Sequence, residues 1–141
     1  MKSRILDQII SENTGFEVKV FLNNGTATSM YVDGFDGEYY SVNYVGRNMV
    51  LATDMVSTIV PQFCKTEENV SPKLSSRITS EALKNVLKEG VGRNVKIFMR
   101  SGYQIKATLL DYDGVVAVVK EKIKEKEVKE VINIASISTI G

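Results

Sequence analysis

The chain contains one sequence element twice. Residues 18–25 read VKVFLNNG and residues 95–102 read VKIFMRSG, so the second copy follows the first at an offset of 77 residues. The same offset aligns the copies without a gap from residue 5 through FDG at 35–37, which matches YDG at 112–114. Self-similarity at a fixed offset indicates a repeated structural unit. The sequence therefore predicts a duplicated small domain, whose surfaces come in similar pairs.

The two copies differ in length towards their ends. VSTIV at 56–60 matches ISTIG at 137–141 at an offset of 81, so the second copy carries four extra residues. These fall in the charged stretch 120–130, KEKIKEKEVKE, which has five lysines and four glutamates. Because these charges nearly cancel, we interpret the stretch as a solvated hairpin tip rather than a patch for nucleic acid.

The duplication sets the expected domain boundaries. Repeat 1 covers residues 1–61 and repeat 2 covers 78–141, separated by a linker at 62–77 that holds three serines and few apolar residues. Units of about 60 residues bury only ~60% of the surface of their unfolded chain and are marginally stable alone. We therefore expect the repeats to associate with each other or with those of other chains.

Each repeat is expected to form one helix followed by five short strands. Apolar residues recur at helical spacing near the start of each repeat, and the following segment alternates as a half-buried strand does. Turns are predicted at the glycines that follow asparagine, serine or aspartate, because these residues tolerate the backbone angles of tight turns. Asp36 and Asp113 each precede such a glycine, and turn chemistry is expected to account for both.

Composition limits the classes of function. The net charge is +1, from 18 basic and 17 acidic residues, so the chain lacks the basic character of strong phosphate binders. It contains no histidine, the commonest general base and metal ligand, and so no Ser/His/Asp or Cys/His arrangement. We therefore expect no catalytic residue, no metal site and no cofactor, and we do not expect an enzyme.

The predicted location is the cytoplasm. No apolar run reaches the ~20 residues that a membrane-spanning helix needs, so no membrane partner is expected. The first residues, MKSRILDQIISEN, lack the apolar region and cleavage site of a signal peptide. Cys64 is the only cysteine and cannot form an internal disulfide, which favours a reducing compartment.

The order of these motifs resembles a known family. A short helix, then V-x-[VI]-F-x-x-x-G, then [FY]-D-G and [VI]-S-T-I, is similar to the Sm-like fold of the bacterial RNA chaperone Hfq, and both repeats show it. The resemblance implies a mainly β chain of two tandem Sm-like units, each an N-terminal α-helix followed by a strongly bent five-stranded antiparallel β-sheet. It also implies an RNA chaperone or post-transcriptional regulator that binds single-stranded RNA.

The resemblance also implies a ring. Members of the family assemble into six-membered rings by pairing the fourth strand of one subunit with the fifth strand of the next. A chain with two such units would supply two ring positions, so three chains would make a homotrimer with the form of a hexamer. Ring closure would also remove the unpaired strand edges that small bent sheets expose.

Two of the family's three RNA-binding surfaces are poorly matched. The segment that carries Tyr-Lys-His in the family reads LATDM at 51–55 in repeat 1 and NIA at 133–135 in repeat 2. Of the basic residues expected after the helix, only Lys88 remains. The resemblance therefore gives little support for a uridine-binding pore or a basic rim.

The distal face, which takes A-rich RNA in the family, is better matched. Purines stack on aromatic rings, and polar groups bind the edges of unstacked bases. The resemblance implies a purine-rich RNA site formed by Phe21, Gly25, Thr26, Thr28 and Thr58 in repeat 1 and by Phe98, Gly102, Tyr103, Gln104, Ile105 and Thr139 in repeat 2. Because the repeats differ after the turn glycines Gly25 and Gly102, we expect a small polar pocket to alternate with a larger one around the ring. With few phosphate contacts, the affinity is expected to depend weakly on salt.

Three alternatives stay open. Phe21 and Phe98 also fit a packing role in a ring interface. Thr58 and Thr139 also fit a purely structural role, because threonine favours strands. The near-neutral charge and the missing Lys-His pair also fit a ring-forming protein-interaction scaffold that has lost RNA binding.

Overall fold

The computed structural model describes residues 2–69, 78 and 80–141. In the first half, helix α1 (Arg4–Glu12) precedes strands β1 (Val18–Leu22), β2 (Ala27–Phe35), β3 (Tyr39–Tyr44), β4 (Arg47–Ala52) and β5 (Val56–Val60). The second half has helix α2 (Glu81–Gly90) and strands β6 (Asn94–Met99), β7 (Gln104–Tyr112), β8 (Val116–Ile123), β9 (Lys126–Asn133) and β10 (Ile137–Ile140). Short 3-10 turns, η1 (Thr53–Met55) and η2 (Ile134–Ser136), precede β5 and β10. The mainly β class and the helix near the N-terminus are confirmed, while residues 70–77 of the predicted linker lie outside the described residues.

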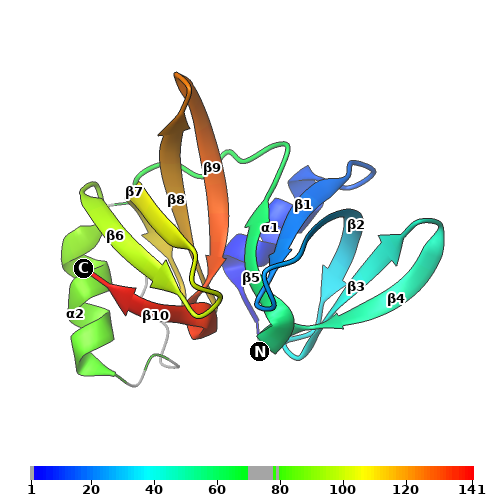
Figure 1. Ribbon diagram of the computed structural model, residues 1–141, viewed down its shortest axis with the longest axis horizontal. Coiled ribbons are helices and arrows are strands. Elements are labelled where there is room, and N and C mark those ends of the chain that lie inside the picture. Colours follow the sequence, from blue (N-terminus) through cyan, green and yellow to red (C-terminus); the bar gives the residue numbers. More distant parts are fainter. Residues whose placement is uncertain (1, 70–77, 79) are drawn as a thin grey trace.

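The ten strands of the described residues belong to one antiparallel sheet in the order β10-β6-β7-β8-β9-β5-β1-β2-β3-β4 (Figure 1). Each half contributes five neighbouring strands in the same internal order: fifth, first, second, third, fourth. The halves join where β9 pairs with β5, with Thr58 opposite Ile132 and Ile59 opposite Val131. The two sheets expected from the sequence are therefore one continuous sheet, because the fourth strand of the second half pairs with the fifth strand of the first.

The same local devices occur at matching positions of the two halves. Ser3 and Ser80 cap their helices, each accepting a hydrogen bond from the backbone N–H three residues later. Gly25 and Gly102 end the first hairpin turns with φ of 88° and 90°, in the left-handed region that glycine adopts without strain. The duplicated sequence thus produces duplicated helix starts and duplicated turns.

Both long second strands contain an irregularity. The register shifts between Val32 and Gly34 where β2 pairs with β3, and between Leu109 and Asp111 where β7 pairs with β8. A bulge of this kind bends the strand and increases its twist. Each half of the sheet is therefore bent at the same place in its sequence.

The core has two apolar clusters, and the first extends across the junction between the halves. Ile5, Leu6 and Ile9 of α1 pack in the first cluster with strands of repeat 1. The same cluster includes residues of repeat 2: Leu110, Val115, Val116, Val118 and Val131. The second cluster centres on Leu87 of α2 and the inner faces of β6 to β9. Because repeat 2 completes the core of repeat 1, burial of apolar surface holds the halves together.

Candidate functional site

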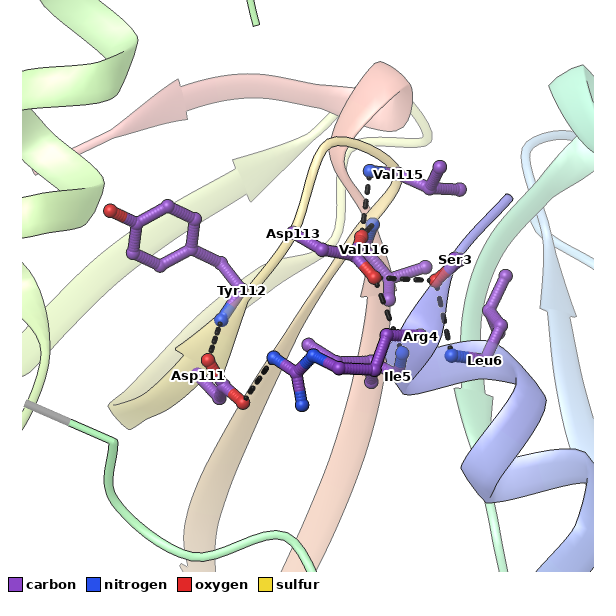
Figure 2. Close-up of polar contacts among 9 residues, drawn as sticks. All are labelled: Ser3, Arg4, Ile5, Leu6, Asp111, Tyr112, Asp113, Val115 and Val116. Carbon is purple, nitrogen blue, oxygen red and sulfur yellow. Dashed lines mark hydrogen bonds and ion pairs between the residues drawn. The ribbon is translucent and has the colours of Figure 1, made fainter. Parts of the chain in front are cut away.

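A buried carboxylate holds one side of the junction. Asp113, in the turn between β7 and β8, is 8% exposed. Its Oδ2 accepts hydrogen bonds from Ser3 Oγ at 2.6 Å and from the N–H of Ile5 at 3.3 Å (Figure 2). Its Oδ1 accepts from the N–H groups of Val115 and Val116 at 2.8 and 2.9 Å. Turn chemistry alone therefore does not account for Asp113, because the same carboxylate also holds the first turn of α1 in repeat 1.

An ion pair lies beside this contact. Arg4 Nη2 donates to Asp111 Oδ2 at 3.0 Å, and the N–H of Tyr112 donates to Asp111 Oδ1 at 2.8 Å (Figure 2). The Asp111 side chain is 4% exposed and the Arg4 side chain 53% exposed. The start of α1 therefore meets two carboxylates at the end of β7: Asp111 is paired with arginine, and Asp113 is stabilised by hydrogen bonds.

A polar cluster from η2 and the end of β9 forms a second part of the junction. Asn133 Nδ2 donates to the carbonyl oxygens of Val56 at 2.8 Å and Thr53 at 3.0 Å. Ser136 Oγ donates to the same Val56 oxygen at 2.8 Å and accepts from Asn23 Nδ2 at 3.0 Å. Asn133 is 3% exposed. The segment that the resemblance aligns with Lys-His in repeat 2 therefore begins with a residue that holds the repeats together.

The junction places one aromatic ring from each repeat side by side. The rings of Phe21, in β1, and Tyr103, just before β7, have centroids 6.1 Å apart and planes 14° apart. They line a cavity of about 340 Å³ together with Leu22, Gly25, Ser57, Ser101 and Gly102. The sequence reasoning assigned Phe21 and Tyr103 to separate pockets, whereas the structure builds one pocket across the junction. Ser57 and Ser101 were not predicted as site residues. The sequence indicates a role only for Ser101, which belongs to a predicted turn.

A lysine accompanies each first-strand phenylalanine. Lys19 Nζ lies 5.2 Å from the ring centroid of Phe21, and Lys96 Nζ lies 5.4 Å from that of Phe98. Both distances are within the range of cation–π interactions. Phe98 is 37% exposed. Each repeat thus presents an aromatic ring with a positive charge on the same face of its first strand.

Most of the other predicted residues lie at the surface. Thr26 is exposed and Thr28 is half-buried. Gln104 and Thr139 lie opposite Phe98 in the neighbouring strands, and both are exposed. Directly opposed residues project from the same face of a sheet. Phe98, Gln104 and Thr139 therefore share one accessible surface.

Two predicted residues are not accessible. Ile105 is 1% exposed and packs in the second apolar cluster, because neighbours along a strand alternate and Gln104 takes the outer face. Thr58 is 2% exposed, because β5 lies between β1 and β9, whereas Thr139 is on the edge strand β10. We exclude both side chains from the candidate site, and the structural role considered for Thr58 fits its burial.

Two glutamates near Tyr103 were missed by the sequence reasoning. Glu130 is 4% exposed, and burial, with a smaller effect of the Glu121 charge, raises its pKa to about 7. Burial raises the pKa of Glu121 as well, and burial followed by these two carboxylates raises the pKa of Tyr103. The expectation of a solvated tip is therefore wrong for Glu130. The sequence does indicate this burial, because Val128, Glu130 and Ile132 stand at every second position of β9 and therefore share its inner face.

Within residues 2–69, 78 and 80–141, no three His, Cys, Asp or Glu side chains gather closely enough to hold a metal ion. Over the same residues, no helix has both the length and the apolar character required to cross a bilayer. Comparisons of the chain with protein-family models, with curated proteins and with solved structures found no match.

Proposed function

We propose that this chain is an Hfq-like RNA-binding protein, an RNA chaperone or post-transcriptional regulator, that binds single-stranded purine-rich RNA. The observation on which the proposal rests is the near-parallel pair of Phe21 and Tyr103 in the wall of an open cavity, with Lys19 beside Phe21. Stacking on such rings is worth ~1–3 kcal/mol per base. The adjoining glycine turns add backbone groups and the Ser101 hydroxyl, which can bind the polar edges of a base.

The distance between the two rings sets how a base could bind. Aromatic carbons make contact at ~3.5 Å, so a base held between two rings needs them ~7 Å apart. The centroids of Phe21 and Tyr103 are 6.1 Å apart. A base could therefore enter between the rings only if their side chains move apart.

The plan of each half supports the Sm-like part of the proposal. Both halves have a helix followed by five strands, in the spatial order fifth, first, second, third, fourth. Both have a bend in the second strand. This plan supports the proposal that each repeat is the helix-capped, strongly bent five-stranded sheet that the resemblance implies.

We also propose that three chains close a ring, as a homotrimer with the form of a hexamer. Within the chain, the fourth strand of repeat 2 (β9) already pairs with the fifth strand of repeat 1 (β5). The two strands at the open edges of the sheet are the fourth strand of repeat 1 (β4) and the fifth strand of repeat 2 (β10). Val131 of β9 is 1% exposed, whereas Val50, its counterpart in β4, is 67% exposed. Pairing of β4 with β10 of a second chain would cover Val50 and leave no free edge.

The turn aspartates support the same geometry. Asp36 Oδ1 accepts from the N–H groups of Glu38 and Tyr39 at 2.9 and 2.8 Å, as Asp113 Oδ1 does in its own turn. The counterpart of Ser3 is Ser80. In the proposed ring, Ser80 of one chain would donate to Asp36 of the next, as Ser3 donates to Asp113 inside the chain. Phe98 would likewise face Thr26 of the next chain, a smaller and more polar pocket than that of Phe21 and Tyr103.

Fluorescence anisotropy with labelled A-rich and U-rich strands of equal length tests RNA binding. We expect binding of the A-rich strand at micromolar protein or below, and at least a ~10-fold loss in Phe21→Ala with Phe98→Ala, because two stacking platforms are removed. Phe16→Ala is the matched control, since Phe16 is 46% exposed but lies outside the site, against Phe63. No binding of the A-rich strand by the wild type would sink the proposal. Unchanged affinity in the double variant would show that the face is wrongly assigned.

The alternative is a ring-forming protein-interaction scaffold without RNA, which the net charge of +1 favours. Purified protein that carries no nucleic acid, judged by the ratio of absorbance at the nucleic-acid and protein maxima, and that binds neither strand would support it. For either function we propose a cytoplasmic location, because Cys64 has no partner for an internal disulfide.

A further inference from the structure

Repeat 2 carries an open groove lined by lysines. Its volume is about 750 Å³, and Lys96, Lys106, Lys120 and Lys122 line it together with Glu121 and Glu127. The lysines of β6 and β7 alternate with buried core residues such as Ile97 and Ile105, so they project from the outer face of the sheet. The groove therefore lies on the opposite face of these strands from the second apolar cluster.

The register of the strands brings these charges together. Lys96 lies directly opposite Lys106, and Lys120 lies opposite Thr108. Like charges directly opposite each other destabilise a sheet. An anion between Lys96 and Lys106 would relieve this repulsion, so the arrangement fits a surface that meets negative charge.

Few acidic groups neutralise the groove. Lys120 Nζ pairs with Glu127 Oε1 at 3.3 Å, in an ion pair whose side chains are 41% and 59% exposed. In the part of the chain that the structure describes, Lys96, Lys106 and Lys122 form no ion pair. Glu121 alternates with Lys120 and Lys122 along β8 and lies opposite Val128 in β9, so its side chain projects from the other face of the strand. The groove therefore keeps an excess of positive charge despite the near-neutral chain.

Repeat 1 lacks this groove. Lys96 is matched by Lys19, but Ser29 and Asn43 stand at the positions of Lys106 and Lys120. Lys122 has no counterpart, because the four extra residues of repeat 2 lengthen the β8–β9 hairpin there. This hairpin projects beyond the rest of the sheet (Figure 1). The extension is thus one wall of a basic surface rather than only a solvated tip.

We propose that this groove binds the sugar–phosphate backbone of the single-stranded RNA whose bases stack on Phe98, an inference that rests on the proposed function. Lys96 belongs to both features, because it lines the groove and its Nζ lies 5.4 Å from the Phe98 ring centroid. A positive groove that follows the backbone beside aromatic stacking platforms is how proteins hold single strands. Lys106, Lys120 and Lys122 therefore make repeat 2 the half that binds phosphates.

The groove changes the expected salt dependence. For single strands, the logarithm of the binding constant falls with the logarithm of salt concentration by ~0.7 for each phosphate neutralised. Three lysines without acidic partners then give a slope of about −2 rather than the weak dependence that composition predicted.

The test compares two labelled strands of equal length, an A-rich strand and an abasic strand that keeps the phosphates. Binding is measured over a series of salt concentrations for the wild type, for Lys106→Gln with Lys122→Gln, and for Lys65→Gln with Lys126→Gln. The last variant removes the same charge from exposed residues outside the groove. We expect the wild type to bind both strands. The groove variant should weaken both at least ~10-fold at low salt and reduce the slope by ~1.4, while the control keeps its slope.

The outcomes separate this inference from the proposed function. If the A-rich strand binds and the groove variant changes neither affinity nor slope, the inference is overturned and the proposed function stands. If the abasic strand binds through the groove as tightly as the A-rich strand, the inference holds and base recognition fails. If neither strand binds the wild type, both are overturned. Because the groove lysines repel one another, we expect the groove variant to unfold at a temperature no lower than the wild type.

Discussion

The junction inside the chain and the open edge of the sheet are formed by corresponding strands, β9 and β4, but only β9 has a neighbouring strand on both sides. Val131, at the junction, is 1% exposed, and its counterpart Val50, at the edge, is 67% exposed. The junction also has polar side chains that the edge lacks, because Ala52 stands where repeat 2 has Asn133, and Met55 where it has Ser136. Hydrogen bonds from Asn133 and Ser136 fix the register at the junction.

This difference indicates how a duplicated chain divides its interfaces. A contact inside one chain forms at the high effective concentration that the linker provides. A contact between chains has no such help and depends more on apolar area, which β4 offers through Met49 and Val50, 46% and 67% exposed. We therefore expect one ring to contain two kinds of interface, polar within chains and more apolar between them.

The largest expected effect comes from placing a charge on the open edge. Val50→Asp would put a carboxylate in the pairing strand, and we expect light scattering to show a fall from three times 15.7 kDa to one chain. Val45→Asp is the control, since Val45 is 87% exposed in the turn beside β4. A wild-type mass near that of a single chain would refute the ring. A Val50→Asp protein that keeps three chains would show that this edge is not the interface.

The two turn aspartates give the next effect. In the single-chain Val50→Asp background, Asp113→Ala removes four hydrogen bonds and is expected to cost about 4 kcal/mol of unfolding free energy in urea. Asp36→Ala removes two hydrogen bonds within its own exposed turn and is expected to cost clearly less. Equal costs for the two changes would contradict the role given to Asp113 at the junction.

A smaller effect concerns Glu130, whose counterpart at the open edge is Met49. Its pKa is raised from 4.5 to about 7, so its contribution to stability is complete below pH 4.5 and is lost as pH rises through 7. Between pH 5 and 8, the wild type should lose about 2–3 kcal/mol of unfolding free energy relative to Glu130→Gln. The exposed Glu127→Gln is the control and should follow the wild-type pH profile. Parallel profiles for wild type and Glu130→Gln would disprove a buried, protonated carboxyl.

The local parts of the fold could be predicted from the sequence. The spacing of Ile5, Leu6 and Ile9 and the alternation after Val18 depend on neighbours along the chain, which is why the helix and the strand class were predicted. The pairing of β9 with β5 could not be predicted from pattern, because alternation shows which face of a strand is buried but not which edge it joins. The resemblance implied such pairing between chains, and the structure has it within one.

The candidate site shows the same limit. Phe21 and Tyr103 were both predicted, but their contact depends on the junction and so crosses the two repeats. Ile105 was included because it follows the turn glycine, although its alternation with Gln104 places it in the core. Glu130 and the lysine groove were missed because the charges of 120–130 were added together, while a strand sends its neighbours to opposite faces.

A double-mutant cycle between Phe21 and Tyr103 tests the central claim most directly. The affinity for the A-rich strand is measured for the wild type, Phe21→Ala, Tyr103→Ala and the double variant. If one base contacts both rings, each single change should weaken binding about tenfold, and the double change should weaken it by less than the product, with a coupling of ~1 kcal/mol. Single changes without effect, or effects that multiply fully, would contradict a shared base-binding pocket built from the two repeats.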